Sequence, residues 1–530
     1  MKKWSVVIIL ALAQFVMVLD STVMNVSITT VVKDLGTTVN AMQAAIAFYT
    51  LTMAALMLVG AKMCAKWGLV KTFVVGSLIY ALGSFITAIA SSMGMLFVGW
   101  SVIEGIGAVL VIPAIAALVA TNYKGTDRIT AYAIIGGISG AAAAAGPLIG
   151  GFMTTYLSWR YVFIAEVIIM LGVIAFAKKF KSMPARSNVK IDMPSAFLSA
   201  SGLVIIVLAL LQSKTWGWIT PIVKPEIGGQ EIAPFGISVV AYMLVVGAGL
   251  LWAFYNRQQK LEETGGEPLL KVSMLKIGRL RSGLATLMAQ FMITAAVFFI
   301  VPVYLQTVQG LDALETGMKI LPLSVALILF SIVGSKLIYR YSPKRIVRYG
   351  QYLLALGVLF LLGAVDVELA SLSFAMSMFL IGAGLGLLAS QLGNVNVSSV
   401  PEKDSNEVGG LQGTFQNMGS SLGTALIGSV LIASLTTGFV SSVQSSDISA
   451  QAKETITDNV KTVQIVPADT VPQLAMERGA DEATANTLAQ IYEESQLQSL
   501  KQAIFFLFVL SLILISFSRN IPDKILAKSK

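Results

Sequence analysis

The chain has 530 residues, of which 56% are hydrophobic and only 12% are charged, and its formal net charge is +9. A soluble globular protein carries about twice that charged fraction, so a soluble fold is excluded. The excess of Lys and Arg does not indicate nucleic-acid binding, because membrane proteins concentrate these residues in their cytoplasmic loops.

Apolar runs of about 20 residues, the length that crosses a bilayer as a helix, recur along the chain. The first run continues as a full span without a cleavage site, so we interpret it as a membrane helix and not as a signal peptide. The pair 192–213 and 233–255 has the weakest pattern, and twelve spans would remain without it. Fourteen spans are predicted: 5–28, 41–64, 70–92, 94–121, 129–155, 158–178, 192–213, 233–255, 282–307, 314–336, 346–366, 370–398, 405–436 and 499–519.

The distribution of Lys and Arg predicts the orientation of these spans. Most of them fall in loops on one side, above all in the 257–281 segment, and the side rich in Lys and Arg is cytoplasmic. Both termini are therefore expected in the cytoplasm. The polar segment 437–498 is then an extracytoplasmic loop with one or two short helices. It is either a lid or a solvated linker, and its composition favours the linker.

Small residues dominate one predicted span, which reads GGISGAAAAAGPLIGG at 136–151. In lipid, small residues let helix backbones approach closely, and a proline removes a backbone donor. We predict a conformational hinge at Gly146, Pro147, Gly150 and Gly151, and a close-contact seam without motion is the alternative.

Several segments resemble known transporter motifs in the right order. GPLIGG at 146–151, followed by SWRYVF at 158–163, is similar to the fifth-span signature of proton-coupled antiporters in the major facilitator superfamily. LDSTVMNVSI at 19–28 resembles the first-span motif of the 14-span drug:proton antiporter group, and residues 409–428 resemble its thirteenth span.

This resemblance implies an all-α membrane protein with the major facilitator fold, made of two six-helix bundles and two extra helices. Residues 1–180 would form the N-terminal bundle, 181–280 the inserted helices and a cytoplasmic linker, and 281–530 the C-terminal bundle. The resemblance also implies a monomeric, multi-pass protein of a prokaryotic plasma membrane. One departure stands out: Ser101 replaces a fourth-span Arg that the family uses in proton coupling.

Acidic residues inside the predicted spans are the candidates for proton coupling. The chain has no histidine, so a carboxyl group is the natural proton carrier, and a charge inside a membrane costs at least about 2.5–3.5 kcal/mol. Packing hydrogen bonds are the alternative for Asp20 and Glu104, an ion pair with Arg160 for Glu166, and a helix cap for Glu407. The predicted proton-coupling residues are Asp20, Glu104, Glu166 and Glu407.

Amide side chains are the candidates for lining a substrate cavity. Gln391 and Asn394 share one face of the twelfth span, and Gln412 and Gln416 share one face of the thirteenth. Interhelical hydrogen bonding is the alternative role for such amides. The predicted lining is Gln14, Asn25, Gln290, Gln391, Asn394, Gln412 and Gln416.

The sequence therefore predicts a proton-coupled antiporter that exports amphipathic or cationic drugs or toxic organic compounds by alternating access. Its partners would be a small-molecule substrate, protons and the lipid bilayer, with no nucleic acid. Export or import of an endogenous metabolite or lipid, or a sensor without transport, remain alternatives. No enzyme is expected, since the sequence has no hydrolase constellation and no nucleotide-binding G-x-x-x-x-G-K-[ST], and no cofactor or metal is expected either.

Overall fold

The computed structural model describes residues 4–177, 180, 189–227, 230–400, 405–450, 453 and 463–523. The predicted domain boundary at residue 181 and much of 451–462, within the predicted outer loop, lie outside these residues.

The described residues contain fourteen helices that are long and apolar enough to cross a membrane, and every predicted span corresponds to one of them. The fourteen-span prediction is therefore confirmed, and the twelve-span alternative is wrong. In chain order the spans are α1 (Ser5–Val26), α3 (Val39–Trp67), α4 (Leu69–Ala88), the continuous α5 (Met93–Leu96), η1 (Phe97–Glu104) and α6 (Gly105–Asn122), α7 (Gly125–Tyr156), α8 (Arg160–Ala177), α9 (Met193–Trp216), α10 (Val239–Glu263), α12 (Gly278–Thr307), α13 (Ala313–Leu337), α14 (Pro343–Ala364), α15 (Ser371–Val397), α16 (Ser405–Ser445) and α19 (Glu482–Leu514).

Short elements connect the spans. They are α2 (Ile28–Leu35), α11 (Val272–Leu275), α18 (Val471–Glu477), the 3-10 helices η2 (Pro234–Gly236), η4 (Ala468–Thr470) and η5 (Ile515–Asn520), and a two-stranded antiparallel hairpin of β1 (Glu226–Ile227) and β2 (Gln230–Glu231). Polar caps start several spans: Thr38 accepts a hydrogen bond from the Ala41 amide, and Asp312 and Glu315 form a capping box at α13.

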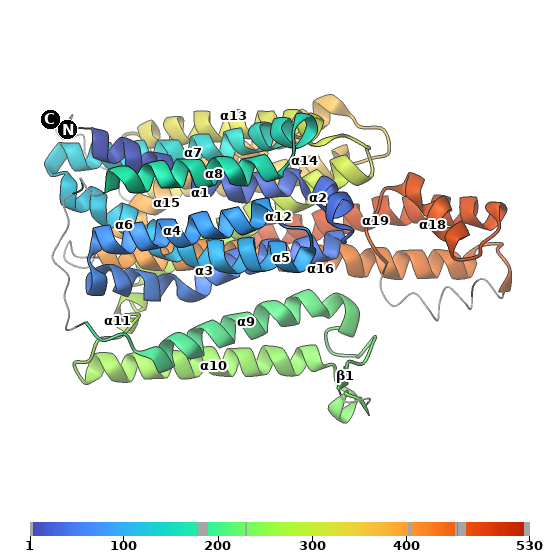
Figure 1. Ribbon diagram of the computed structural model, residues 1–530, viewed down its shortest axis with the longest axis horizontal. Coiled ribbons are helices and arrows are strands. Elements are labelled where there is room, and N and C mark those ends of the chain that lie inside the picture. Colours follow the sequence, from blue (N-terminus) through green and yellow to red (C-terminus); the bar gives the residue numbers. More distant parts are fainter. Residues whose placement is uncertain are drawn as a thin grey trace.

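The spans form two halves, α1–α8 and α12–α19, with α9 and α10 between them in sequence. The halves meet where α3 packs along α16 and where α7 packs along α13. Both ends of the chain lie at the same end of the bundle in Figure 1, as an even number of spans requires. We call the opposite end, where α16 and α19 project, the outer end, because the Lys and Arg distribution predicts cytoplasmic termini.

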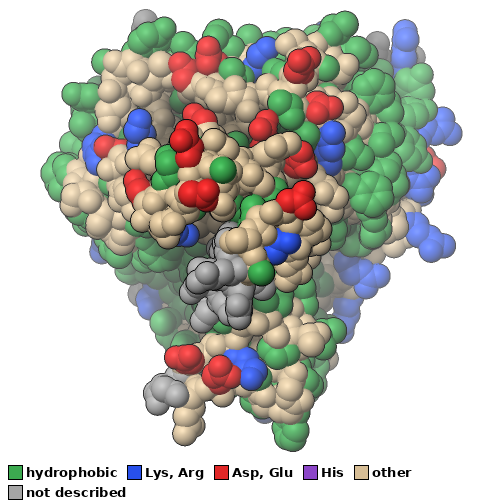
Figure 2. Space-filling view, turned by 90° about the vertical axis from the view of Figure 1, so that its right-hand side faces the viewer, with side chains coloured by type: hydrophobic (Ala, Val, Ile, Leu, Met, Phe, Trp, Pro, Cys, Tyr) green, Lys and Arg blue, Asp and Glu red, His purple; other side chains and the backbone are tan. Residues whose placement is uncertain are grey.

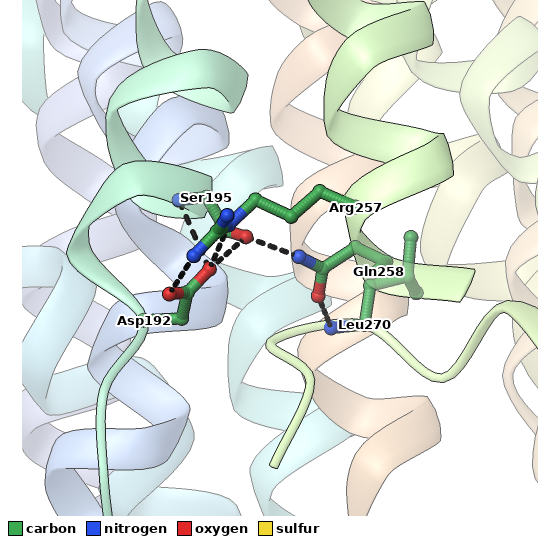
Figure 3. A network of polar contacts seen from close by, with 5 residues as sticks. All are labelled: Asp192, Ser195, Arg257, Gln258 and Leu270. Carbon is green, nitrogen blue, oxygen red and sulfur yellow. Dashed lines mark hydrogen bonds and ion pairs between the residues drawn. The ribbon is translucent and has the colours of Figure 1, made fainter. Parts of the chain in front are cut away.

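The inserted helices α9 and α10 run side by side along one flank of the bundle (Figure 1). At their inner end, Figure 3 shows a polar network in which Asp192 caps α9 and accepts hydrogen bonds from Nε and Nη2 of Arg257 on α10, both at 2.7 Å. Gln258 joins this network by donating to Ser195 and accepting from the Leu270 amide at 3.0 Å. The Arg257 guanidinium lowers the pKa of Asp192 to about 2, so the network is charged at neutral pH.

The outer segment is better packed than the sequence indicates. Helix α16 continues to Ser445 and α19 begins at Glu482, and both project beyond the other spans with α18 against α19 (Figure 1). Phe439 and Tyr492 are buried there, and the Tyr492 hydroxyl donates to the Gln464 carbonyl at 3.0 Å. Figure 2 views this projection end-on and shows many acidic side chains on its surface. These buried side chains belong to the main hydrophobic core of the described residues, so the solvated-linker interpretation does not describe this part of the segment.

Candidate functional site

Three of the four predicted proton-coupling residues meet inside the N-terminal half. Asp20 lies on α1, Glu104 at the end of η1 and Glu166 on α8. One carboxylate oxygen of each lies within 4.8 Å of the others, and the exposed fractions of the three residues are 1%, 0% and 1%. We call these three residues the acid cluster. Spans 1, 4 and 6 thus supply one buried acid each to a single point.

A local change of helix geometry places Glu104. Residues Phe97–Glu104 form a π-helical segment inside an otherwise α-helical span, and π segments occur frequently at functional sites. Helix α4 approaches this segment closely, because a Cβ atom on Gly83 would lie 2.7 Å from Cα of Glu104. Gly83 therefore lets α4 cover the acid cluster without leaving a gap.

Neutral donors hold two of the three carboxyl groups. The Trp100 indole Nε1 donates to both oxygens of Asp20, at 2.9 and 3.0 Å, and its ring stacks on Tyr49 with the centroids 4.9 Å apart. The Ser84 hydroxyl donates to Glu166 at 3.2 Å. The cluster thus has fixed hydrogen-bond partners that the sequence analysis missed. The spacing of Ser77, Tyr80 and Ser84, which marks one polar face on α4, is a sequence signal that could have indicated Ser84 but not Trp100.

Glu104 differs from its two neighbours in its hydrogen bonding. Within the described parts of the chain, its carboxylate oxygens and the nearby buried Tyr80 hydroxyl have no partner at full hydrogen-bond geometry, although the hydroxyls of Tyr80 and Ser84 lie beside the carboxylate. None of the ion pairs found in those parts involves the acid cluster. Ser101, at the position of the family Arg, donates to the Ala45 carbonyl at 2.8 Å instead. The cluster therefore contains acids without a basic partner.

Glu407 lies apart from the acid cluster. It sits in the first turn of α16, its side chain is 40% exposed, and it pairs with Lys271 at 2.9 Å. The alternative partner for Glu166 is also wrong, because Arg160 binds Asp34 on α2 and the Ala90 carbonyl. The guanidinium of Arg160 lowers the pKa of Asp34, which fixes this ion pair in its charged form outside the cluster.

Three of the seven predicted cavity amides make separate contacts between or within helices. Gln391 donates to the Gly334 carbonyl at 2.9 Å, which ties α15 to α13, and Gln412 donates to the Gly393 carbonyl at 3.0 Å, which ties α16 to α15. Asn25 donates to Ser21 within α1. Gln290 faces a small pocket inside the C-terminal half, Asn394 is exposed, and Gln14 and Gln416 are half-buried.

Known proteins match this arrangement. A family model for the Major Facilitator Superfamily matches residues 10–424. The chain belongs to this superfamily. It is a transporter and not an enzyme, and its fourteen apolar helices and bacterial relatives make it a multi-pass plasma membrane protein, as the sequence predicted.

Relatives of this superfamily member include proteins named for antibiotic resistance and export. It is 27% identical to the puromycin resistance protein pur8 of Streptomyces alboniger over 81% of each chain. It is 25% identical to the probable actinorhodin transporter of Streptomyces coelicolor, over 81% of this chain and 72% of that protein. It is also 25% identical to the multidrug transporter protein MdtP of Bacillus subtilis, over 80% of this chain and 74% of that protein.

Solved structures of similar shape support the fold alone. A bacterial homolog of the human lysosomal transporter Spinster, in an inward-facing conformation, has a TM-score of 0.57 at 14% identity and covers 98% of this chain and 97% of that one. A peptide transporter of the POT family has a TM-score of 0.60 at 13% identity, over 99% and 98% of the two chains. The major facilitator fold predicted from the sequence is thus confirmed.

The small residues of α7 lie where the two halves of the transporter meet. A Cβ atom on Gly146 or Gly150 would collide with α1, and one on Gly151 would collide with the backbone of α13. A Cβ atom on Gly317 of α13 would likewise collide with the Pro147 carbonyl. The helix is continuous through Pro147, so the structure shows the close-contact seam, and the hinge stays a prediction.

One surface pocket of the transporter differs from this site in its chemistry. It is lined by Arg279, Lys344 and Arg519 among others, near the end of the described chain, and none of the three clustered acids lines it. The acid cluster and the seam are therefore the candidate functional features of the transporter.

Proposed function

We propose that this transporter is a proton-coupled antiporter that exports amphipathic or cationic organic compounds by alternating access. The observation that carries the proposal is the acid cluster of Asp20, Glu104 and Glu166. Three like charges this close, with no basic partner, would repel strongly in a dry interior. Binding or release of a proton would change this repulsion, and the resulting change in free energy can drive transport.

The cluster is mechanically connected to the seam between the halves. Thr22 and Val23 follow Asp20 on α1 and touch Gly146 and Gly150 of α7. The other side of α7 touches α13 at Gly151. A movement of α1 on protonation would thus reach the contact between the halves through two layers of close backbone packing.

Polar contacts near the outer end also cross between the halves. The Thr29 hydroxyl donates to Gln306 on α12 at 2.6 Å, and the Gln306 amide donates to the Val26 carbonyl at 2.7 Å. The two partners of Gln306, Val26 and Thr29, follow Asp20 in the sequence by less than three helical turns. Opening the outer end would require these bonds to break, as alternating access demands.

The substrate class is supported by the relatives and by the charge of the interior. Relatives are named for resistance to or export of puromycin, actinorhodin and tetracenomycin C. An interior with three acids favours cations over anions. A proton gradient supplies about 2.3 kcal/mol per charge for each 100 mV of membrane potential.

The test uses proteoliposomes that contain a pH-sensitive dye, an imposed proton gradient and a panel of cationic dyes and drugs. We expect a compound to trigger proton movement in the wild type, and Asp20→Asn and Glu104→Gln to abolish it. Glu407→Gln, an acid-to-amide change outside the cluster, is the matched control and should retain it. Undiminished proton movement in both cluster variants would rule out the cluster as the coupling site.

A second candidate function is transport of an endogenous metabolite. The riboflavin transporter RibZ of Clostridioides difficile is 24% identical over 82% of this chain and 90% of that protein. The same assay with riboflavin and other neutral metabolites distinguishes the two, because only the metabolite transporter would respond to them and not to the cationic panel.

A further inference from the structure

The inserted helix α9 lies across the junction of the two halves at its outer part. Its residues Leu203, Val207 and Leu211 pack in one apolar cluster with Ala47 and Leu51 of α3 and with Ala425 of α16. By contrast, its partner α10 is mostly exposed and packs chiefly on α9. Helix α9 therefore contacts both moving parts of the transporter, where α10 contacts mainly α9.

A chain of buried polar groups runs through this junction. The Lys214 ammonium of α9 donates to the Gln43 Oε1 of α3 at 2.9 Å. The Gln43 amide nitrogen donates in turn to the carbonyls of Thr424 and Ala425 on α16, both at 3.1 Å. Gly428 leaves the space for this, because a Cβ atom there would collide with Gln43. One glutamine thus links all three helices, and the charge of Lys214 orients its amide toward α16.

The charge of Lys214 needs an explanation beyond packing. The residue is 9% exposed, and no acid in the described parts of the chain forms an ion pair with it. An ammonium with only an amide partner is costly to bury, and an apolar side chain would seal the junction at lower cost. Ser429 separately ties α16 to α9 by donating to the Leu210 carbonyl at 2.6 Å, so Lys214 is not needed for that attachment.

We propose that Lys214 is a positioning residue of the transport cycle. While the outer end is closed, Lys214 holds the Gln43 amide against α16. It also favours opening, because water can then reach its charge. The hydrogen bonds of Gln43 stabilise the closed form, and hydration of the ammonium stabilises the open form. The inserted pair is then part of the gate, and not a passive tether between the halves. This inference rests on the alternating access of the proposed function, but not on its proton coupling or its substrate.

The two residues should shift the gate in opposite directions. Gln43→Ala removes the two hydrogen bonds of Gln43 to α16 and leaves the ammonium buried without a partner, so the outer end should open more. Lys214→Met removes the buried charge and leaves the Gln43 bonds to α16, so the outer end should open less. A merely structural tie would instead loosen the junction in both variants.

The experiment measures the separation of the halves by double electron–electron resonance between spin labels at Lys33→Cys and Ser441→Cys, exposed positions on α2 and α16. The background carries Cys64→Ala, which removes the single native cysteine. Compared with the unaltered junction, Gln43→Ala should enlarge the long-distance population and Lys214→Met should reduce it. Lys214→Arg keeps the charge and the donor, so it should give the same distribution of label distances as the unaltered junction.

Lys224→Met is the matched control, since it removes an ammonium that is 48% exposed in the loop after α9. It should leave the distances unchanged. If Lys214→Met does not purify as a folded protein, Lys214→Gln carries the same test. Shifts in the same direction for Gln43→Ala and Lys214→Met, or no shift in either, would overturn the proposal. Since the distances are read without substrate or a proton gradient, such a failure would leave the acid cluster as the proposed coupling site.

Discussion

The two halves of the transporter share a six-helix plan but differ in the chemistry of their interiors. The N-terminal half buries three acids, whereas the polar side chains buried in the described C-terminal half are amides and hydroxyls such as Gln290, Gln351 and Gln391. An amide keeps its charge state at every physiological pH, and a carboxyl group does not. Among the described residues, the two halves therefore share a fold, but buried carboxyl groups occur in the N-terminal half alone.

The close helix packing, in comparison, is similar in both halves. Gly83 admits the backbone of Glu104 in the first half, and Gly384 admits the backbone of Leu354 in the second. Small residues thus serve the fold on both sides, as expected for helices that associate in lipid. The difference between the halves therefore lies in the polar groups and not in the way the helices meet.

The largest expected effect comes from comparing two substitutions, one of an acid in the first half and one of an amide in the second half. Glu166→Gln should lower compound-driven proton release in proteoliposomes to the level of empty vesicles, because it removes a proton-binding group. Gln290→Leu should retain that release within about twofold, since its Oε1 has no hydrogen-bond partner in the described structure. Equal losses in the two variants would remove the distinction between the halves.

The next effect concerns the donor that holds Asp20. Trp100→Phe keeps an aromatic ring against Tyr49 but removes the hydrogen bonds to both oxygens of Asp20. A hydrogen bond to a charged group contributes about 1.5–3 kcal/mol, so transport should fall by about tenfold or more. Trp252→Phe on α10, 68% exposed, is the control and should transport normally. A fully active Trp100→Phe would show that Asp20 needs no fixed donor.

A third test separates packing from coupling. Gly83→Val and Gly384→Val should each destabilise the purified protein by about 1–3 kcal/mol in thermal unfolding, because both force a side chain against a helix backbone. Gly172→Val, which faces open space, should have little effect. Only Gly83→Val should also impair proton release in the surviving folded protein. Impaired release in Gly384→Val to the same degree would mean that packing alone explains the loss.

The smallest effect lies outside both halves, in the Asp192–Arg257 pair of the inserted helices. The pKa of Asp192 falls from 3.8 to about 2 on folding, so the pair stabilises the folded state above about pH 4 and loses this contribution as the pH falls through about 2. Asp192→Asn should lower the free energy of unfolding at pH 7 by up to about 1 kcal/mol. The difference from wild type should stay constant from about pH 8 to pH 5 and shrink below pH 4. Glu231→Gln, in an exposed pair, should show almost no difference at any pH. A difference that grows on acidification would contradict the assigned charge state.

The sequence by itself determined the membrane class, the fourteen spans, the superfamily and the rarity of acids in the interior. These properties are local: hydropathy over about 20 residues, and motifs a few residues long, need no knowledge of neighbouring helices. For the same reason the sequence indicated Asp20, Glu104 and Glu166 as candidate proton-coupling residues, since a charge in a span is costly wherever it faces.

Only the tertiary structure decided which of these residues lie together. The meeting of three acids from α1, η1 and α8 depends on how each helix is rotated and on the π segment before Glu104, and neither is encoded in a local pattern. The separation of Glu407, the use of Gln391 as an interhelical tie and the link of Lys214 to Gln43 have the same origin. Helix packing brings residues together over hundreds of positions in sequence, and hydropathy does not record which faces will touch.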